Sequence, residues 1–361
     1  MVPGPGRPTG LLPTAPAAVA SAALRDHGHA STASARLRSS VLGALARLGL
    51  ARLVPGTLVV EEVGTGGGLI PHLSAELGVQ VHVSVRLGPP RANRKPVLAL
   101  MRANGSVVGY TKVGVNDLTK RRIEAETAAL AHLAGADLGT LIAPTVLSSG
   151  PWGEASYLTL SPLRTRSGGG IDPAVRDAAA RDLVTAFPTR QHRLAESPWW
   201  RALRARVSEG SAAEARQLDE LAGAVEGKLG PAQLVFGAQH GDWTPWNLHT
   251  VDGVTHVWDW ERFAGDAPVG MDQLHYAFHT ATAIHGERPA EALSQVQARV
   301  PELVSIHEIA DPRALWAVYL VQAGERFLTD RQEDAGSKKG ALSTWLLPTL
   351  DRAVAELPDH G

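Results

Sequence analysis

The chain has 361 residues, enough for one large domain or two modest domains that each bury a core. Its 35 lysines and arginines nearly balance its 36 aspartates and glutamates, so no overall electrostatic field draws it to nucleic acid or to an anionic membrane. The absence of cysteine excludes disulfides, a thiol nucleophile and a cysteine-ligated zinc site, and it is typical of a reducing compartment, here the cytoplasm.

The N-terminal residues 1–54 are predicted to be an extension. Residues 1–35 are rich in Pro, Gly, Ala and Ser, which predicts a flexible tail, and Pro13 and Pro16 interrupt the apolar stretch that a signal peptide would need. The following "ARLRSSVLGALARLGLARL" has apolar residues at helical spacing, which predicts an amphipathic helix. It could pack on the main domain or contact a membrane or partner. No apolar run reaches the about 18 residues of a membrane span, so no membrane partner is expected.

Residues 55–163 are predicted to form a lobe built on an antiparallel sheet. The segments "VQVHVSVRL", "PVLALM" and "VVGYTKV" are rich in β-branched residues and are separated by the turn sequences "GPPRANRK" and "RANGS". A helical pattern follows in "LTKRRIEAETAALAHLAG", and "SYLTLSPL" predicts one more strand. Residues 164–361 are mostly helical in pattern, broken by short strands around Leu248 and Val257. This is an α+β arrangement.

The segment "LVVEEVGTGGGLIPHLSAELG" has the strand, Gly-rich turn and helix of a nucleotide-binding fold. Such a fold needs an acidic residue after the next strand to bind the ribose hydroxyls. There is no Asp or Glu between Leu77 and Asn116, and the segment lacks the Lys of a phosphate-binding loop. We therefore interpret residues 64–68 as a turn.

Three histidines in "HYAFHTATAIH", His275, His279 and His285, have the spacing of some zinc-protease ligands. However, Tyr276 stands where the general-base Glu is required, and Thr282 replaces the Gly that turns the chain. We interpret His275 and His279 as residues on a helix face that make ordinary hydrogen bonds.

The densest set of polar groups is "QHGDWTPWNLHTVDGVTHVWDWE", residues 239–261. Buried carboxylates are costly unless they are paired or hold a cation, so this stretch is either a solvated loop or a site. Here His240-Gly241-Asp242 is followed five residues later by Asn247, and Asp259 ends a predicted hairpin. This spacing of His, Gly, Asp, Asn and Asp resembles the catalytic segment of the aminoglycoside phosphotransferase and choline kinase family. The "GDAPVGMDQL" that follows resembles the next motif of the same family.

The resemblance spans about residues 79–274, and its motifs are concentrated between His240 and Asp272. It implies a bilobal protein-kinase-like fold, with a sheet-rich nucleotide lobe and a larger helical lobe that carries the acceptor site. Phosphoryl transfer from ATP needs a carboxylate to orient and deprotonate an acceptor hydroxyl, and oxygen ligands to hold Mg²⁺. By resemblance Asp242 is the catalytic base and Asn247 and Asp259 are the metal ligands. His240 is expected to fix the loop by hydrogen bonds.

The upstream sheet offers a cation for the phosphates. Lys112 lies on the third of these strands, and Glu126 begins an apolar helical face in "EAETAALAHL". In the kinase-like fold such a Lys binds the α- and β-phosphates of ATP and is held by a helix Glu. Glu124 is the rival partner, although its side chain points about 200° around the helix from that of Glu126.

Two further nucleotide contacts are predicted. The turn "LGPPRANRKPV" has a single Gly where protein kinases carry a Gly-rich loop, so Arg91, Arg94 and Lys95 either contact phosphate with their side chains or form an exposed hairpin tip. By resemblance the backbone from Ser161 to Leu163 would meet the edge of the adenine.

The sequence thus predicts an ATP- and Mg²⁺-dependent phosphotransferase that acts on a hydroxyl group of a small molecule. An amino sugar or aminoglycoside is the first hypothesis for the acceptor, because aromatic and acidic side chains suit sugar rings and amines. Either these side chains bind the acceptor or they are ordinary core and surface residues: Trp199, Trp200, Trp316, Trp345, Glu325, Asp330, Glu333 and Asp334. The alternative function is a catalytically inactive kinase-like protein that binds nucleotide or a partner.

Overall fold

The computed structural model describes residues 2–3, 8–11, 13, 16–28, 43, 47, 67–87, 94–165, 171–329 and 341–358. The chain divides into two compact units. Unit 1 comprises Met1–Ala134 and Pro144–Ser167, and unit 2 comprises Gly135–Ala143 and Gly168–Gly361. Among the described helices, none has both the length and the apolar character needed to cross a membrane.

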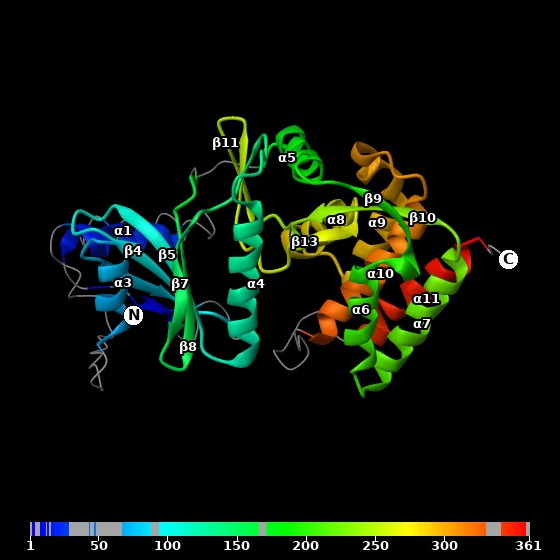
Figure 1. Ribbon diagram of the computed structural model, residues 1–361, viewed down its shortest axis with the longest axis horizontal. Coiled ribbons are helices and arrows are strands. Elements are labelled where there is room, and N and C mark those ends of the chain that lie inside the picture. The colour runs from blue at the N-terminus through cyan, green and yellow to red at the C-terminus, as the bar shows by residue number, and fades with distance from the viewer. Residues whose placement is uncertain are drawn as a thin grey trace. The chain divides into compact units, whose positions relative to one another are not determined.

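Unit 1 is built on a seven-stranded sheet with the order β1-β2-β3-β4-β5-β8-β7, in which every neighbouring pair is antiparallel (Figure 1). The strands are β1 (Val2–Pro3), β2 (Pro8–Leu11), β3 (His82–Arg86), β4 (Val97–Met101), β5 (Val107–Gly114), β7 (Val146–Trp152) and β8 (Ala155–Leu160). The helices whose bounds lie among its described residues are α1 (Ala17–Gly28), α3 (Leu69–Glu76) and α4 (Asp117–Leu133).

Strand β4 shows why both faces of this sheet are covered. Successive side chains of a strand point to opposite faces. Leu98 and Leu100 join a cluster with Leu73 of α3, whereas Ala99 and Met101 pack against α1. These four of the five β4 side chains are buried, so this strand has a continuous apolar sequence instead of an alternating one.

The N-terminal segment differs from the predicted flexible tail. Of its first 35 residues, the described ones form β1, β2 and α1, and the sheet continues through the pairing of β2 with β3. Val19 and Ala23 of α1 are fully buried against Ala99 and Met101. Small side chains allow this close packing, which composition alone does not reveal. Most of the predicted amphipathic helix over 35–53 lies outside the described residues.

Helix α4 begins with a capping box, in which the side chain of Asn116 accepts from the Thr119 amide and the Thr119 side chain accepts from the Asn116 amide. Its buried positions Ile123, Glu126, Leu130 and Leu133 recur at helical spacing. Glu126 therefore lies on the packed face of the helix.

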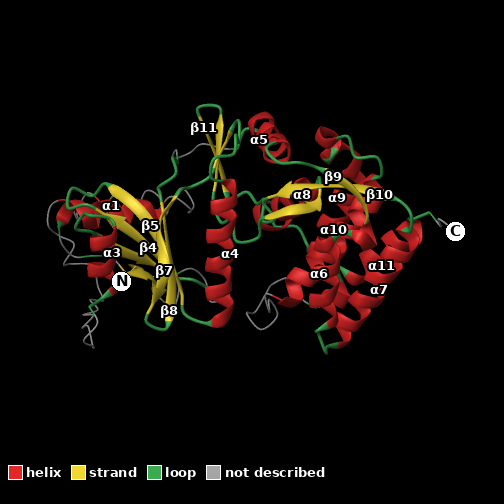
Figure 2. Ribbon diagram, viewed as in Figure 1, coloured by secondary structure: helices red, strands yellow, loops and turns green. Residues whose placement is uncertain are grey.

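Unit 2 is mainly helical and contains two small three-stranded sheets (Figure 2). Its α-helices are α5 (Pro173–Thr185), α6 (Pro198–Ser208), α7 (Ala213–Leu229), α8 (Met271–His279), α9 (Pro289–Leu303), α10 (Pro312–Thr329) and α11 (Leu347–Glu356). The short helical turns are η2 (Leu194–Glu196), η3 (Thr280–Ile284), η4 (Ser305–His307) and η5 (Leu342–Thr344).

The first small sheet has the order β13-β10-β9, from β9 (Arg190–Arg193), β10 (Gln233–Gln239) and β13 (Ala264–Pro268). The second has the order β11-β12-β6, from β6 (Leu141–Ile142), β11 (Leu248–Val251) and β12 (Val254–Val257). The two-residue turn between β11 and β12 is Asp252-Gly253, and both residues have positive φ. This is the hairpin that the sequence predicted around Leu248 and Val257.

The core of unit 2 surrounds α10, which is buried on nearly all sides. Trp200, Trp316 and Trp345 are each less than 5% exposed and belong to this core, with Trp199 packed against it. Of the two readings of these tryptophans, the core reading is therefore correct. The predicted α+β class is confirmed, with an antiparallel sheet in one unit and a mainly helical second unit.

Candidate active site

Unit 1 contains an ion pair between Lys112 of β5 and Glu126 of α4. The Lys112 Nζ lies 2.7 Å from Oε1 and 2.6 Å from Oε2 of Glu126, and the Glu126 side chain is fully buried. The rival Glu124 is exposed. A buried carboxylate requires a counter-charge, and Lys112 supplies it. The pair therefore fixes the ammonium group of a strand lysine at a defined place.

The loop after β10 depends on Gly241. This residue has φ +82°, and a Cβ atom at this position would lie 2.2 Å from the carbonyl oxygen of Arg262. A side chain is excluded both by the backbone conformation and by the lack of space. Glycine is therefore required between His240 and Asp242.

The carboxylate of Asp272 holds the backbone of this loop. Its Oδ2 accepts from the His240 amide at 2.8 Å and its Oδ1 accepts from the Gly241 amide at 2.9 Å. Burial raises the pKa of Asp272 above its ordinary value, against the opposing influence of His240 and these two amides. Asp272 lies in the first turn of α8, so this helix anchors the loop.

His240 fixes the loop from the other side. Its Nδ1 accepts from the Asp242 amide at 3.1 Å, which leaves the Nε2 proton to be donated to the Trp258 carbonyl at 3.1 Å. The ring also packs edge-on against Trp260, with centroids 4.6 Å apart. His240 is thus committed to structural hydrogen bonds, as the sequence analysis expected.

The carboxylate of Asp242 is held at both oxygens, yet its side chain remains 27% exposed. Asn247 Nδ2 donates to Oδ2 at 2.8 Å and to the Asp242 carbonyl at 3.0 Å, and His275 Nε2 lies 3.2 Å from Oδ1. Burial opposes ionisation of Asp242, but the hydrogen bond from His275 and the charges of His275, Arg262 and Arg326 outweigh it. The pKa of Asp242 therefore lies well below its ordinary value, and the side chain is an ionised hydrogen-bond acceptor.

Arg326 of α10 completes this cluster. Its Nη1 lies 3.3 Å from His275 Nε2, the same nitrogen that faces Asp242. One ring nitrogen cannot donate to a carboxylate and accept from a guanidinium at once. Because Asp242 is ionised, Nε2 carries a proton and donates to Asp242, and Arg326 acts on the carboxylate through its charge.

His275 and Arg326 are site residues that the sequence analysis missed, and the anchoring role of Asp272 was missed as well. His275 was interpreted as an ordinary helix-face residue, although it follows Asp272 by three positions and so shares its face of α8. That spacing could have identified it. Nothing local identifies Arg326, which lies on another helix 51 residues further along the chain.

The three histidines 275, 279 and 285 do not gather into a metal site among the described residues. The rings of His275 and His279 lie 4.3 Å apart, and His285 is instead 4.0 Å from Glu287.

Asn247 and Asp259 bracket the β11–β12 hairpin in unit 2. Asn247 directs its amide nitrogen to Asp242, so its side-chain oxygen is the atom left for a ligand. The adjacent Trp258 amide donates to the Asn247 carbonyl at 3.2 Å, and Asp259 has a left-handed backbone with φ 71°. An amide oxygen and a carboxylate are hard donors that fit Mg²⁺ with room for water and phosphate.

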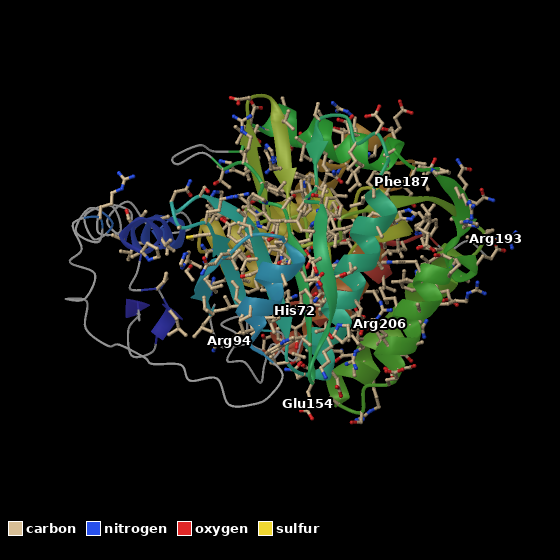
Figure 3. The ribbon with its side chains drawn as sticks, turned by 60° about the vertical axis from the view of Figure 1, so that its left-hand side comes forward. His72, Arg94, Glu154, Phe187, Arg193 and Arg206 are labelled. Atoms are coloured by element: carbon tan, nitrogen blue, oxygen red, sulfur yellow. The ribbon has the colours of Figure 1, made fainter. Side chains whose placement is uncertain are left out.

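The remaining predicted nucleotide contacts are those to adenine, at Ser161 and Leu163, and those to phosphate, at Arg91, Arg94 and Lys95. The Ser161 amide donates to the Thr145 carbonyl at 2.9 Å, so it is not the donor for adenine, and Leu163 is half-buried. Arg94, labelled in Figure 3, and Lys95 are half-buried residues just before β4. Arg91 lies outside the described residues.

Glu325 of α10 forms an ion pair within unit 2. It is 5% exposed and its Oε1 accepts from Nε of Arg206 on α6, labelled in Figure 3, at 2.7 Å. Of the two alternatives for Glu325, this ion pair favours a structural residue over an acceptor contact, because an arginine already neutralises the carboxylate. Asp330, Glu333 and Asp334 lie outside the described residues.

No protein-family model matches this chain, and no curated protein matches it in sequence. Solved structures do resemble it. A thermostable mutant of aminoglycoside phosphotransferase APH(4)-Ia, in a ternary complex with ADP and hygromycin B, is 14% identical with a TM-score of 0.49, covering 80% of this chain and 98% of that one.

Two other solved structures are of the same kind. Aminoglycoside phosphotransferase APH(3'')-Id from Streptomyces rimosus, in complex with ADP and streptomycin, is 20% identical with a TM-score of 0.44, covering 66% of this chain and 92% of that one. Spectinomycin phosphotransferase APH(9)-Ia, bound to ADP and its antibiotic, is 12% identical with a TM-score of 0.45, covering 80% and 95%. These enzymes are small-molecule phosphotransferases, the class that the segment from His240 to Asp272 resembles.

Proposed function

We propose that this chain is an ATP-dependent phosphotransferase that moves the γ-phosphoryl group to a hydroxyl of a small molecule. The observation that carries the proposal is Asp242, a partly exposed carboxylate kept ionised by His275 and oriented by Asn247. An ionised acceptor at a fixed position is what is needed to orient a hydroxyl and take its proton.

The other groups supply the nucleotide half of the reaction. In unit 1, Lys112 would hold the α- and β-phosphates while Glu126 fixes its position. In unit 2, Asn247 and Asp259 would hold Mg²⁺, which neutralises charge on the phosphates when it is bound. Transfer joins the acceptor oxygen to the γ-phosphorus and breaks its bond to the bridging oxygen, which leaves with ADP.

For the acceptor we propose an amine-bearing sugar. Trp246 lies between Asp242 and Asn247 in the loop, is 45% exposed, and packs edge-on against His279 with centroids 5.2 Å apart. An exposed aromatic face fixed in this way suits a sugar ring or a cationic amine. Asp242 and Asp259 add negative charge in the same segment.

The test is turnover of ATP with a panel of amino sugars and aminoglycosides, measured as ADP release. Asp242→Asn should lower the rate by about 10² to 10⁴ and leave ATP affinity nearly unchanged, because the carboxylate acts on the acceptor and not on the nucleotide. Asp252→Asn, at the exposed turn between β11 and β12, is the matched control and should keep full activity.

Two results would contradict the proposal. Near-normal turnover in Asp242→Asn would assign the base to another residue. ATP binding without turnover on any acceptor would favour the alternative, a catalytically inactive protein that binds nucleotide.

We also propose that Arg94 and Lys95 contact phosphate, as the turn before β4 lacks the glycines of a backbone cradle. The double variant Arg94→Ala with Lys95→Ala should lower the affinity for ATP by more than the affinity for adenosine, because adenosine has no phosphate groups that these side chains could contact. The difference should shrink as salt rises, since mobile ions screen exposed charges. Equal weakening of ATP binding and adenosine binding would show that these two side chains do not contact phosphate.

A further inference from the structure

Unit 2 contains a cavity of about 600 Å³ that none of the proposed reaction groups lines. Its walls come from the start of α5, one face of α8 with η3, α9 with the segment that follows it, and Trp243 of the loop after β10. This volume is in the range of small-molecule binding sites. Asp242, Asn247 and Asp259 are not among its lining residues.

The α8 residues that line the cavity lie on a different face of the helix from those that hold the catalytic loop, although Trp243 of that loop also lines the cavity. Gln273, Tyr276 and Thr280 line the cavity, whereas Asp272 and His275 contact the loop. At about 100° per residue the centres of these two sets lie roughly 100° apart around the helix. The α8 residues that line the cavity are therefore distinct from those that hold the carboxylate of Asp242.

Three buried oxygen atoms of the wall have no hydrogen-bond partner among the residues that the structure describes. They are Gln273 Oε1, Thr280 Oγ1 and Glu287 Oε2, and the Gln273 residue is only 7% exposed. By contrast, Thr282 Oγ1 in the same segment donates to the Phe278 carbonyl at 2.9 Å. Buried oxygens without partners are costly, so three in one wall indicate a ligand that donates hydrogen bonds.

A π-helical turn produces this arrangement. In η3 the His285 amide donates to the Thr280 carbonyl at 3.1 Å, five residues back, and the Glu287 amide donates to the Ala281 carbonyl at 3.0 Å. The wider turn brings Glu287 back to the cavity where an α-helix would have continued past it. Such turns are rare and are frequent at functional sites.

The charges of the wall favour a cation. Arg176 pairs with Asp177 at 2.6 Å and covers the Tyr276 ring at 4.4 Å. Arg299 pairs with Glu302 at 2.9 Å. Both guanidinium groups are thus matched by neighbouring carboxylates, and Glu287 is the remaining negative charge, with His285 4.0 Å from its other oxygen.

We propose that this cavity is a second ligand site, which binds a small molecule carrying a protonated amine beside hydroxyl groups. The amine would meet Glu287, and the hydroxyl donors would meet Gln273 Oε1 and Thr280 Oγ1. The site does not depend on the proposed phosphotransferase activity, since none of its residues has a role in that reaction.

Calorimetric titration of the full chain with glucosamine, and with glucose as the matched neutral sugar, tests the site. Glucosamine should bind at least about tenfold more tightly than glucose, because its amine adds a charge-assisted contact. Glu287→Gln keeps the shape of the side chain and should reduce glucosamine affinity to that of glucose. Thr280→Val should lower the affinity for both sugars.

Steric and control variants complete the test. Ala277→Phe places a ring in the cavity and should abolish binding of both sugars. Glu291→Gln and Thr282→Val lie outside the wall and should leave binding unchanged. Circular dichroism checks folding, and if Ala277→Phe fails to fold, the Glu287→Gln comparison decides alone.

Three outcomes would overturn the proposal. One is the absence of saturable glucosamine binding to the unaltered protein. Another is unchanged binding in Glu287→Gln. The third is binding that Asp242→Asn removes and Ala277→Phe preserves, which would place glucosamine at the catalytic loop.

Discussion

Asp242 shows how one residue depends on neighbours from several elements. Asn247 holds its Oδ2 from the same loop, His275 holds its Oδ1 from α8, and Arg326 contributes charge from α10. The loop itself requires Gly241, because no side chain fits against Arg262. His275 is therefore a positioning residue for the carboxylate rather than a group that meets the substrate.

Replacing His275 should test this role. His275→Asn is too short to reach Oδ1 in the same way, so the carboxylate loses one of its two restraints. We expect kcat of the proposed reaction to fall about tenfold to a hundredfold, while KM for ATP stays unchanged. Gln273→Asn, on the same helix but on the face that lines the cavity, is the control. Equal losses in the two variants, or a loss of ATP binding, would indicate a general effect on α8 instead.

At the scale of elements, α6 and α10 are joined by the ion pair of Arg206 with Glu325. The glutamate side chain is 7% exposed, whereas the arginine side chain is 46% exposed. The pair is therefore asymmetric, since water can solvate Arg206 but not Glu325. Its main effect is to compensate a buried carboxylate in the packed face of α10.

Removal of the arginine should accordingly destabilise unit 2. Arg206→Ala should lower the free energy of unfolding by about 1 to 2 kcal/mol, a value kept modest by the exposure of the guanidinium. In a Glu325→Gln background, Arg206→Ala should lower the free energy of unfolding clearly less, because position 325 no longer carries a buried charge. Urea denaturation of the four proteins measures this, with the exposed Arg201→Ala as control. Identical costs in both backgrounds would show that the pair contributes no coupling energy.

At the scale of the whole molecule, the two units provide separate cores, so unfolding need not be a single transition. Of the nine tryptophans, all except Trp152 belong to unit 2, so tryptophan fluorescence reports mainly on that unit.

His307 makes the stability of unit 2 depend on pH. Burial, with the nearby charge of Arg181, lowers the pKa of His307 from 6.5 to about 4.

The sign of this effect follows from proton binding. Between pH 6.5 and about 4 the unfolded chain binds a proton at His307 that the folded chain does not, so stability falls as the pH is lowered. His307 should account for a loss of about 2 to 3 kcal/mol over this range. His307→Gln should remove that part of the loss, measured as the difference in unfolding free energy between pH 7 and pH 4.5. His285→Gln is the exposed control, and parallel pH profiles for His307→Gln and the unaltered protein would refute the prediction.

The sequence by itself determined the features that depend on local spacing. The antiparallel strands, the β11–β12 hairpin and the α+β class follow from hydrophobic patterns and turn residues, and helical spacing was enough to choose Glu126 over Glu124 as the partner of Lys112. The set of Asp242, Asn247 and Asp259 was visible because its members lie within one short segment. Their roles remain part of the proposed function.

Only the tertiary structure decided the contacts between distant segments. It brought His275 and Arg326 to Asp242, paired Glu325 with Arg206 and packed α1 on β4, where composition had predicted a flexible tail. It also placed the oxygens of Gln273, Thr280 and Glu287 around one cavity, where they have no hydrogen-bond partner in the described part of the chain. The physical reason is that helix and strand periodicity fixes which neighbouring residues share a face, whereas the partner of that face is chosen by the packing of the whole core.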